Sequence, residues 1–182
     1  MTEEDVVIDI ISFLDKYSIP YALTGGFAVS FYGKPRSTHD LDIIVQLIAG
    51  NRNIKELMTA FIKDYYVSEE GITDAIIHDT MFNIIHQETG FKIDFWILKN
   101  EEYAQESFSR RKRFEILGLT PWILSPEDMI INKLQWYKAA ESDKHLKDAR
   151  GIIEIQKDNI DQKYLHKWTN KLGLNSELKQ VV

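Results

Sequence analysis

Two aspartates on either side of a leucine constrain this chain more than any other feature of its sequence. Asp40 and Asp42 come directly before the apolar run at residues 43–45, so they lie at the start of a predicted strand. Because side chains alternate between the two faces of a strand, both carboxylates are expected on one face while Leu41 points into the core. Two like charges side by side are unfavourable unless a cation lies between them. The pattern indicates either a surface turn or a site for a divalent cation bound by oxygen ligands.

A glycine pair precedes these aspartates. Gly25 and Gly26 follow a short apolar strand predicted at residues 21–24 and lead into residues 27–32, which fit a short helix. Backbone amides at a helix N-terminus favour phosphate groups, and glycine lets a ligand come close to the backbone. A plain turn is the alternative interpretation of the pair. Phosphates at the glycines and cations at the carboxylates would be two halves of one site.

A third aspartate lies inside a later strand. Residues 81–86 and 91–97 are predicted strands joined by a hairpin turn. In the second strand Lys92, Asp94 and Trp96 share one face, where the tryptophan is either packed or available for stacking on a base. Asp94 is either an edge-strand acid with a local partner or a third ligand. Three such carboxylates would hold two cations roughly 3.5 to 4 Å apart, as in phosphoryl transfer.

Composition narrows the classes of function. The formal net charge of −6 argues against a broad basic surface for long nucleic acid and favours a small or local substrate. The chain has no cysteine, which excludes disulfides and thiolate chemistry. Its N-terminus is acidic, unlike a signal peptide, and no apolar run approaches the ~20 residues that span a bilayer. We therefore expect a cytoplasmic protein that makes no contact with a membrane.

The order of elements predicts an α/β (α+β) fold with a mixed sheet and a helical C-terminal part. Predicted helices cover residues 3–17, 27–32, 54–65, 101–108, 129–140, 143–156 and 161–172. Predicted strands cover residues 21–24, 40–46, 81–86, 91–97, 110–117 and 119–124, with a loop at 49–53 and an ambiguous stretch at 66–80. Ser125 and Pro126 are typical of a helix start, so we expect a core over residues 1–124 and a helical extension over 125–182.

In their order these motifs resemble the nucleotidyltransferase superfamily typified by DNA polymerase beta. Gly25 and Gly26 match its glycine motif, Asp40 and Asp42 its paired metal ligands, and Asp94 its third carboxylate. The chain is most similar to the small bacterial branch that includes lincosamide-type antibiotic nucleotidyltransferases and AbiEii-like toxins. The resemblance covers roughly residues 20–150 and implies a polymerase-beta-like fold, with residues 1–124 as the nucleotidyltransferase core.

Further candidates come from the same resemblance. The stretches SPEDMIINKLQWYKA and HLKDARGII resemble the part of this branch in which a helical lysine and a Lys-Asp pair follow the sheet. This implies that Lys133 contacts phosphate, that Arg36 assists, and that Lys147 and Asp148 are weaker candidates. The commonest glycine motif of the superfamily is Gly-Ser, whereas this chain has Gly26 at the second position.

The resemblance implies a transferase that moves an NMP group from a nucleoside triphosphate such as ATP to a hydroxyl of a small molecule or an RNA end, releasing pyrophosphate. Two Mg²⁺ ions, with Mn²⁺ as an alternative, would be held by Asp40, Asp42 and Asp94. The alternative function is a non-catalytic nucleotide-binding module of the same fold, which acts as a regulatory or toxin–antitoxin partner. A homodimer is compatible with either function.

Two other groups have simpler interpretations. Residues 110–113 (RRKR) form the only basic cluster, which is either a solvated strand or turn, or a local site for an acidic acceptor or a tRNA end. Trp122, Trp136 and Trp168 are expected in the core.

Overall fold

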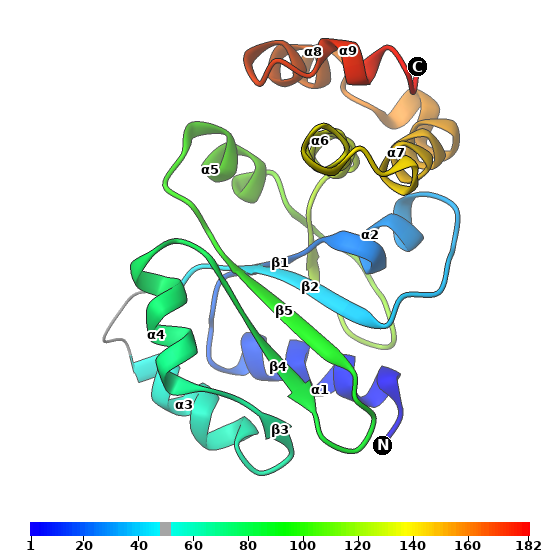
Figure 1. Cartoon of the computed structure of the whole chain (residues 1–182). Helices are drawn as coiled ribbons and strands as arrows, with labels where there is room; N and C mark the ends of the chain where they lie inside the picture. The colour runs from blue at the N-terminus through cyan, green and yellow to red at the C-terminus, as the bar shows by residue number, and fades with distance from the viewer. Residues whose placement is uncertain (48–51) are drawn as a thin grey trace.

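A mixed β-sheet organises residues 1–47 and 52–182, which are the residues that the computed structural model describes (Figure 1). Among them the strand order across the seven-stranded sheet is β3-β4-β5-β2-β1-β7-β6. The strands are β1 (Tyr21–Leu23), β2 (Asp40–Val45), β3 (Tyr65–Tyr66), β4 (Met81–His86), β5 (Lys92–Ile97), β6 (Lys112–Arg113) and β7 (Trp122–Ile123). β2 is parallel to β5 and antiparallel to β1. The predicted fold class, a mixed sheet with helices, is confirmed.

Helices cover both sides of this sheet (Figure 1). On one side lie α1 (Glu3–Lys16), α3 (Arg52–Phe61) and α4 (Glu69–Ile77). On the other lie α2 (Gly25–Tyr32), α5 (Glu102–Ser109), α6 (Pro126–Ala140), α7 (Asp143–Gln156), α8 (Gln162–Lys171) and α9 (Asn175–Leu178), with a 3₁₀ turn at Lys157–Asn159. In the described part of the chain, every helix is too short or too polar to cross a bilayer.

Local sequence signals explain where the principal helices begin. Thr2 and Asp5 form a capping box at α1, in which each side chain bonds to the backbone of the other residue. Ser125 accepts a hydrogen bond from the backbone of Asp128, and Pro126 occupies the first turn of α6. The helix starts predicted at these two positions are confirmed.

The strand predicted over residues 110–117 is wrong for most of its length, since β6 contains only two residues. The backbone N–H of Arg110 bonds to the carbonyl of Glu106, so residue 110 still belongs to the end of α5. Leu117 and Gly118 have positive φ angles of 52° and 74°, which end any extended run there. β6 and β7 do pair in antiparallel register, as their position across Gly118 suggests.

Three other boundaries differ from prediction. α2 begins at Gly25, so both glycines lie in its first turn. α3 ends at Phe61, the predicted helical residue Tyr65 belongs to β3, and the ambiguous stretch after it contains α4. Residues 49–51 of the predicted loop at 49–53 lie outside the described residues, and the remaining two belong to α3. Every described element after β7 is helical, while the division into two parts at residue 124 stays a prediction.

Candidate functional site

The pairing of β2 with β5 brings the three predicted aspartates to one face of the sheet. Asp42 lies opposite Asp94, and Asp40 lies opposite Lys92. Leu41 and Ile93, which face the other way, are also opposite each other and are fully buried. The alternation expected from the sequence is therefore present. We call Asp40, Asp42 and Asp94 the acidic face; their role as metal ligands stays a prediction.

Each carboxylate of the acidic face is held by a different side chain. The contacts are Thr38 Oγ1 to Asp40 Oδ1 at 2.6 Å, Trp96 Nε1 to Asp42 Oδ1 at 3.2 Å, and Lys92 Nζ to Asp94 Oδ2 at 2.7 Å. Among the described residues, the second oxygen of each carboxylate accepts no hydrogen bond. For Asp94 this oxygen, Oδ1, is also buried. The acidic face thus presents three oriented carboxylates, each with one free oxygen.

The neighbouring charges of the acidic face shift the pKa values of Asp42 and Lys92. Burial raises the pKa of the Asp42 carboxyl; the hydrogen bond from Trp96 opposes this rise, and the charges of Asp40 and Asp94 add to it. The pKa of the Lys92 ammonium is raised, mainly by its hydrogen bond to Asp94 and also by the other two carboxylates. The charge of Lys133 also acts on Asp42, so three acids are balanced by two lysines, which leaves an excess of negative charge that favours a further cation.

We tested whether these residues fit the metal that the sequence predicts. Within residues 1–47 and 52–182, no three His, Cys, Asp or Glu side chains stand together as a ready group of metal ligands. Lys92 instead supplies positive charge to Asp94. The buried, unpartnered Oδ1 of Asp94 and the free oxygens of the other two carboxylates fit a divalent cation, which prefers oxygen ligands.

The glycine pair packs directly against the acidic face. Gly25 has a φ of +62°, and a Cβ atom there would lie 1.8 Å from Asp42 Oδ2. A Cβ atom at Gly26 would lie 2.5 Å from Thr38 Oγ1, the hydroxyl that bonds to Asp40. Neither position accommodates a side chain unless its neighbours move. This contact gives a steric reason for Gly26 where the commonest motif has serine.

Asp148 joins the two predicted cationic residues. Arg36 donates from Nε to Oδ1 and from a terminal nitrogen to Oδ2 of Asp148, both at 3.2 Å. Lys133 Nζ lies 3.3 Å from the same Oδ2. Burial lowers the pKa of the Lys133 ammonium, and the charge of Asp148 opposes this. Asp148 is therefore an anchor for Arg36 and Lys133, while Lys147 is exposed and lies outside the cavity described next.

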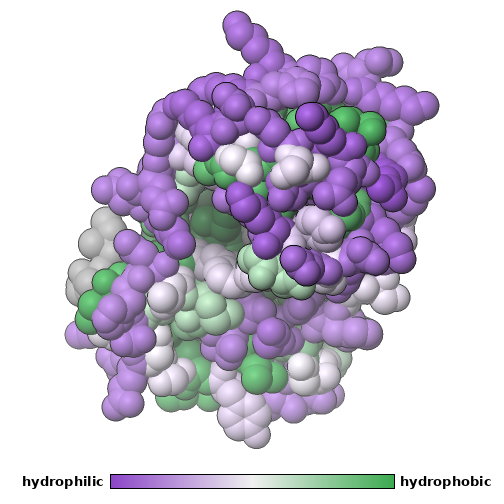
Figure 2. All heavy atoms as spheres, turned by 45° about the horizontal axis from the view of Figure 1, so that its top comes forward, coloured by the Kyte–Doolittle hydropathy of each residue, from purple (hydrophilic) through white to green (hydrophobic). Residues whose placement is uncertain are grey.

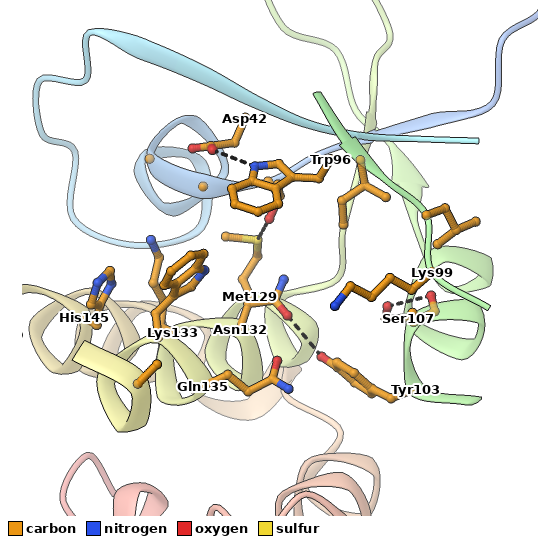
Figure 3. Close-up of a pocket in the computed structure, with 18 of the residues that line it drawn as sticks. Asp42, Trp96, Lys99, Tyr103, Ser107, Met129, Asn132, Lys133, Gln135 and His145 are labelled. Carbon is orange, nitrogen blue, oxygen red and sulfur yellow. Dashed lines mark hydrogen bonds between the residues drawn. The ribbon is translucent and has the colours of Figure 1, made fainter. Parts of the chain in front are cut away.

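A cavity of about 600 Å³ separates the sheet from α5, α6 and α7, and Figure 2 shows the hollow on this side of the molecule. Six of the seven predicted site residues line it, and Asp94 does not. Figure 3 shows Lys133 and His145 at one end, Lys99, Tyr103 and Ser107 at the other, and Asp42 with Trp96 above them. The cavity thus has two separate ends with different side chains.

Sequence reasoning missed several residues that line this cavity, among them Lys99, Tyr103, Asn132, Gln135 and Lys144. A signal was present on α6, because Gln135 and Trp136 follow Asn132 at spacings of three and four residues, and Trp136 follows Lys133 at a spacing of three. A polar stripe at helical spacing indicates a face turned toward water or a ligand.

The basic cluster at residues 110–113 is mostly used within the fold. Arg110 stacks over the ring of Tyr164 at 3.6 Å and pairs with Glu127 at 3.1 Å. Arg113 pairs with Asp15 at 3.0 Å. Arg111 donates to the carbonyl of Phe108 and packs on Trp122. Among contacts within residues 1–47 and 52–182, only Lys112 of the four is exposed without such a partner, so the cluster gives little support to an RNA site.

Comparison with known proteins adds evidence on the fold. No family model and no curated protein matches the sequence. The structure of ANT(2'')-Ia in complex with adenylyl-2''-tobramycin matches with a TM-score of 0.65 at 17% identity, over 98% of this chain and 99% of that one. An antigenic nucleotidyltransferase-like protein from Paracoccidioides brasiliensis matches with a TM-score of 0.55 at 21% identity, over 97% and 90% of the two chains.

A third similar structure is the lincosamide antibiotic adenylyltransferase LnuA with lincomycin bound. Its TM-score is 0.55 at 12% identity, over 85% of this chain and 98% of that one. The match with ANT(2'')-Ia extends over nearly the whole of both chains, so the likeness is one of the entire fold. Together these likenesses show that the chain has the nucleotidyltransferase fold.

Proposed function

We propose that this protein is a metal-dependent nucleotidyltransferase that transfers an NMP group from a nucleoside triphosphate to a hydroxyl group of a small molecule. The observation that carries the proposal is the meeting of three carboxylates, each with a free oxygen, beside a glycine pair at the start of α2. The similarity to antibiotic adenylyltransferases supports this kind of reaction.

The donor triphosphate would bind at the glycine end of the site. Gly25 and Gly26 offer backbone N–H groups at a helix N-terminus, where the helix dipole favours negative charge. Arg36 and Lys133 add two cationic groups that Asp148 holds in place. These residues would bind the phosphates and take up the charge of the leaving pyrophosphate.

The acidic face would orient the acceptor. Asp40, Asp42 and Asp94 would hold Mg²⁺ or Mn²⁺, which supplies Lewis-acid polarisation of phosphate and lowers the pKa of a bound hydroxyl. In the reaction the acceptor oxygen bonds to the α-phosphorus, and the bond from that phosphorus to the β-bridging oxygen breaks. Asp94, which does not line the cavity in this structure, would accept the hydroxyl proton once its carboxylate turns toward the acceptor.

Three observations favour a small acceptor over an RNA end. The cavity has the volume of a typical small-molecule site. The net charge of the chain is −6, and three residues of its basic cluster already have partners within the fold. Two of the similar structures contain small molecules, adenylyl-2''-tobramycin in one and lincomycin in the other.

The proposal is tested by incubating the protein with each labelled nucleoside triphosphate and Mg²⁺ or Mn²⁺. The acceptors are an aminoglycoside and lincosamide panel and, separately, total tRNA. We expect metal-dependent label on a small molecule, and loss of at least 100-fold in Asp42→Asn and Asp94→Asn, in line with losses of metal ligands and catalytic groups. Asp74→Asn, which changes an exposed acid on α4, is the matched control. Full activity in Asp42→Asn, or label on tRNA alone, would contradict the proposal.

A non-catalytic nucleotide-binding module is the second candidate, and the contact between Lys92 and Asp94 favours it because a lysine then neutralises the third carboxylate. Titration calorimetry with each nucleoside triphosphate, with and without Mg²⁺, separates the two functions. An enzyme of the proposed kind requires the metal for tight binding. Tight binding that is independent of metal, with no transfer to any acceptor, would support the module.

A further inference from the structure

Three aromatic rings from different elements meet at the end of the cavity nearest Lys133. Trp96 and Trp136 lie edge to face, with ring centroids 5.8 Å apart and planes at 70°. Trp136 and His145 are stacked, with centroids 6.2 Å apart and planes at 23°. All three residues line the cavity. We call Trp96, Trp136 and His145 the aromatic wall.

Trp136 is unusual within this wall because it is 47% exposed. The expectation that it belongs to the core is wrong, whereas Trp168 is only 2% exposed as expected. Leaving half of an indole in contact with water forgoes a large hydrophobic gain. An exposed aromatic side chain that lines a concave site is typical of a surface that a ligand covers.

The position of Trp136 relative to Lys133 suggests which ligand this is. The two residues are three positions apart on α6, so their side chains lie on one face with Cβ atoms roughly 5 to 6 Å apart. Lys133 is directed toward Arg36 and Asp148, beside the glycine pair. A molecule with phosphates at Lys133 and a flat ring one helical turn further along would match both side chains.

We propose that Trp136, supported by Trp96 and His145, binds the base of the nucleoside triphosphate by stacking. This inference rests on the proposed function and extends it by assigning the aromatic wall to the donor rather than to the acceptor. The acceptor has the opposite end of the cavity, where Lys99, Tyr103 and Ser107 lie (Figure 3). Because every base has a flat face, stacking of this kind gives affinity with little discrimination among bases.

The test compares two probes that differ in the presence of a base. Titration calorimetry measures the binding of ATP and of inorganic tripolyphosphate, both with Mg²⁺, to wild type and to Trp136→Ala. We expect the variant to lose roughly 5- to 100-fold in ATP affinity, the range that base stacking supplies, and to bind tripolyphosphate as wild type does. Trp136→Phe, which keeps a flat ring, should retain most of the ATP affinity.

Tyr66→Ala is the matched control, because Tyr66 is an aromatic residue on β3 that is 67% exposed and lies outside the cavity. It should change neither affinity. The inference is overturned if Trp136→Ala binds ATP normally, or if it weakens ATP and tripolyphosphate equally while its melting temperature stays near that of wild type. If wild type binds neither probe, the proposed function fails together with the inference, and this outcome is distinct from a failure confined to the variant.

Discussion

Asp42 on β2 and Asp94 on β5 are direct partners in a parallel strand pair, and each carboxylate is held by a side chain of β5. Trp96 donates to the first and Lys92 pairs with the second. The backbone hydrogen bonds of the sheet therefore set the spacing of the acidic face. Groups fixed on strands hold their geometry better than groups on loops.

Replacing Gly25 with alanine should destabilise the fold and disturb the acidic face. The positive φ alone costs about 1 to 2 kcal/mol for a residue with a side chain, and the new Cβ would also lie 1.8 Å from Asp42 Oδ2. Gly118→Ala is the control, since Gly118 has a φ of +74° with no atom within 4 Å of the added Cβ. Urea denaturation should show a larger loss for Gly25→Ala, and thermal stabilisation by Mg²⁺ should be lost only there. Equal losses would contradict the steric argument.

Removing the charge of Asp148 should destabilise the protein by about 3 kcal/mol, because two cationic groups then lose a buried partner. Asp148 and Lys133 expose only 7% and 8% of their side chains. Glu154→Gln on the same helix is the control: its pair with Lys34 is exposed to water, so its loss should change the free energy of unfolding much less. Urea denaturation of both variants checks this. A loss for Asp148→Asn no larger than for the control would refute the anchoring role.

Lys133→Met should be at least as stable as wild type at pH 7, although we expect it to bind triphosphate more weakly. Burial lowers the pKa of the Lys133 ammonium from 10.5, so the folded state holds this charge unfavourably. As pH rises toward 10.5, the folded chain loses the proton before the unfolded chain does, and wild type gains stability relative to the variant.

Melting temperatures measured between pH 7 and pH 10.5 test this expectation. The difference between Lys133→Met and wild type should shrink as pH rises through the upper part of this range. Lys112→Met, which replaces an exposed lysine on β6, should differ from wild type by an amount that does not depend on pH. A constant difference for Lys133→Met would mean that the buried charge does not affect stability.

Arg110→Ala should destabilise the packing of α5, α6 and α8 by about 3 kcal/mol, because it leaves buried acids without their cation. Glu127 and Asp128 expose 5% and 0% of their side chains, and Arg110 approaches both. Arg113→Ala removes a more exposed pair with Asp15 and should cost less than about 1 kcal/mol. Thermal denaturation of the two variants compares them directly, and similar melting temperatures would contradict the prediction.

The sequence predicted that the aspartates of the acidic face lie on strands, with Asp40 and Asp42 on the same face, because the alternation of side chains along a strand depends only on local spacing. Asp40 and Asp42 are separated by one residue, and Asp94 occupies a strand with the same alternation. The register that sets Asp42 opposite Asp94 is a tertiary property, as is the contact of Lys92 with Asp94. Local patterns could place these groups on strands, but they could not pair the strands.

The helical half of the site was harder to predict. On α6 the polar residues Asn132 and Gln135 indicate a face turned away from the core, but the pattern does not show that the neighbouring Trp136 is exposed, because tryptophan is usually expected in a core. The roles of Asp148 and Arg36 depend on side chains more than one hundred residues apart in sequence. The predicted strand at residues 110–117 failed because residue 110 still belongs to the end of α5, and because the positive φ angles of Leu117 and Gly118 end the extended run.

The geometry of the site also depends on the register between β5 and β2. Lys92, Asp94 and Trp96 occupy alternate positions, so a shift of β5 by a single residue against β2 would turn all three away together. Ile93 and Phe95, now fully buried, would then face the cavity. The site would thus lose Asp94, its counter-ion Lys92 and Trp96 at the same time as two core side chains became exposed. A molecule with this register would therefore be too unstable to persist as a folded but inactive form.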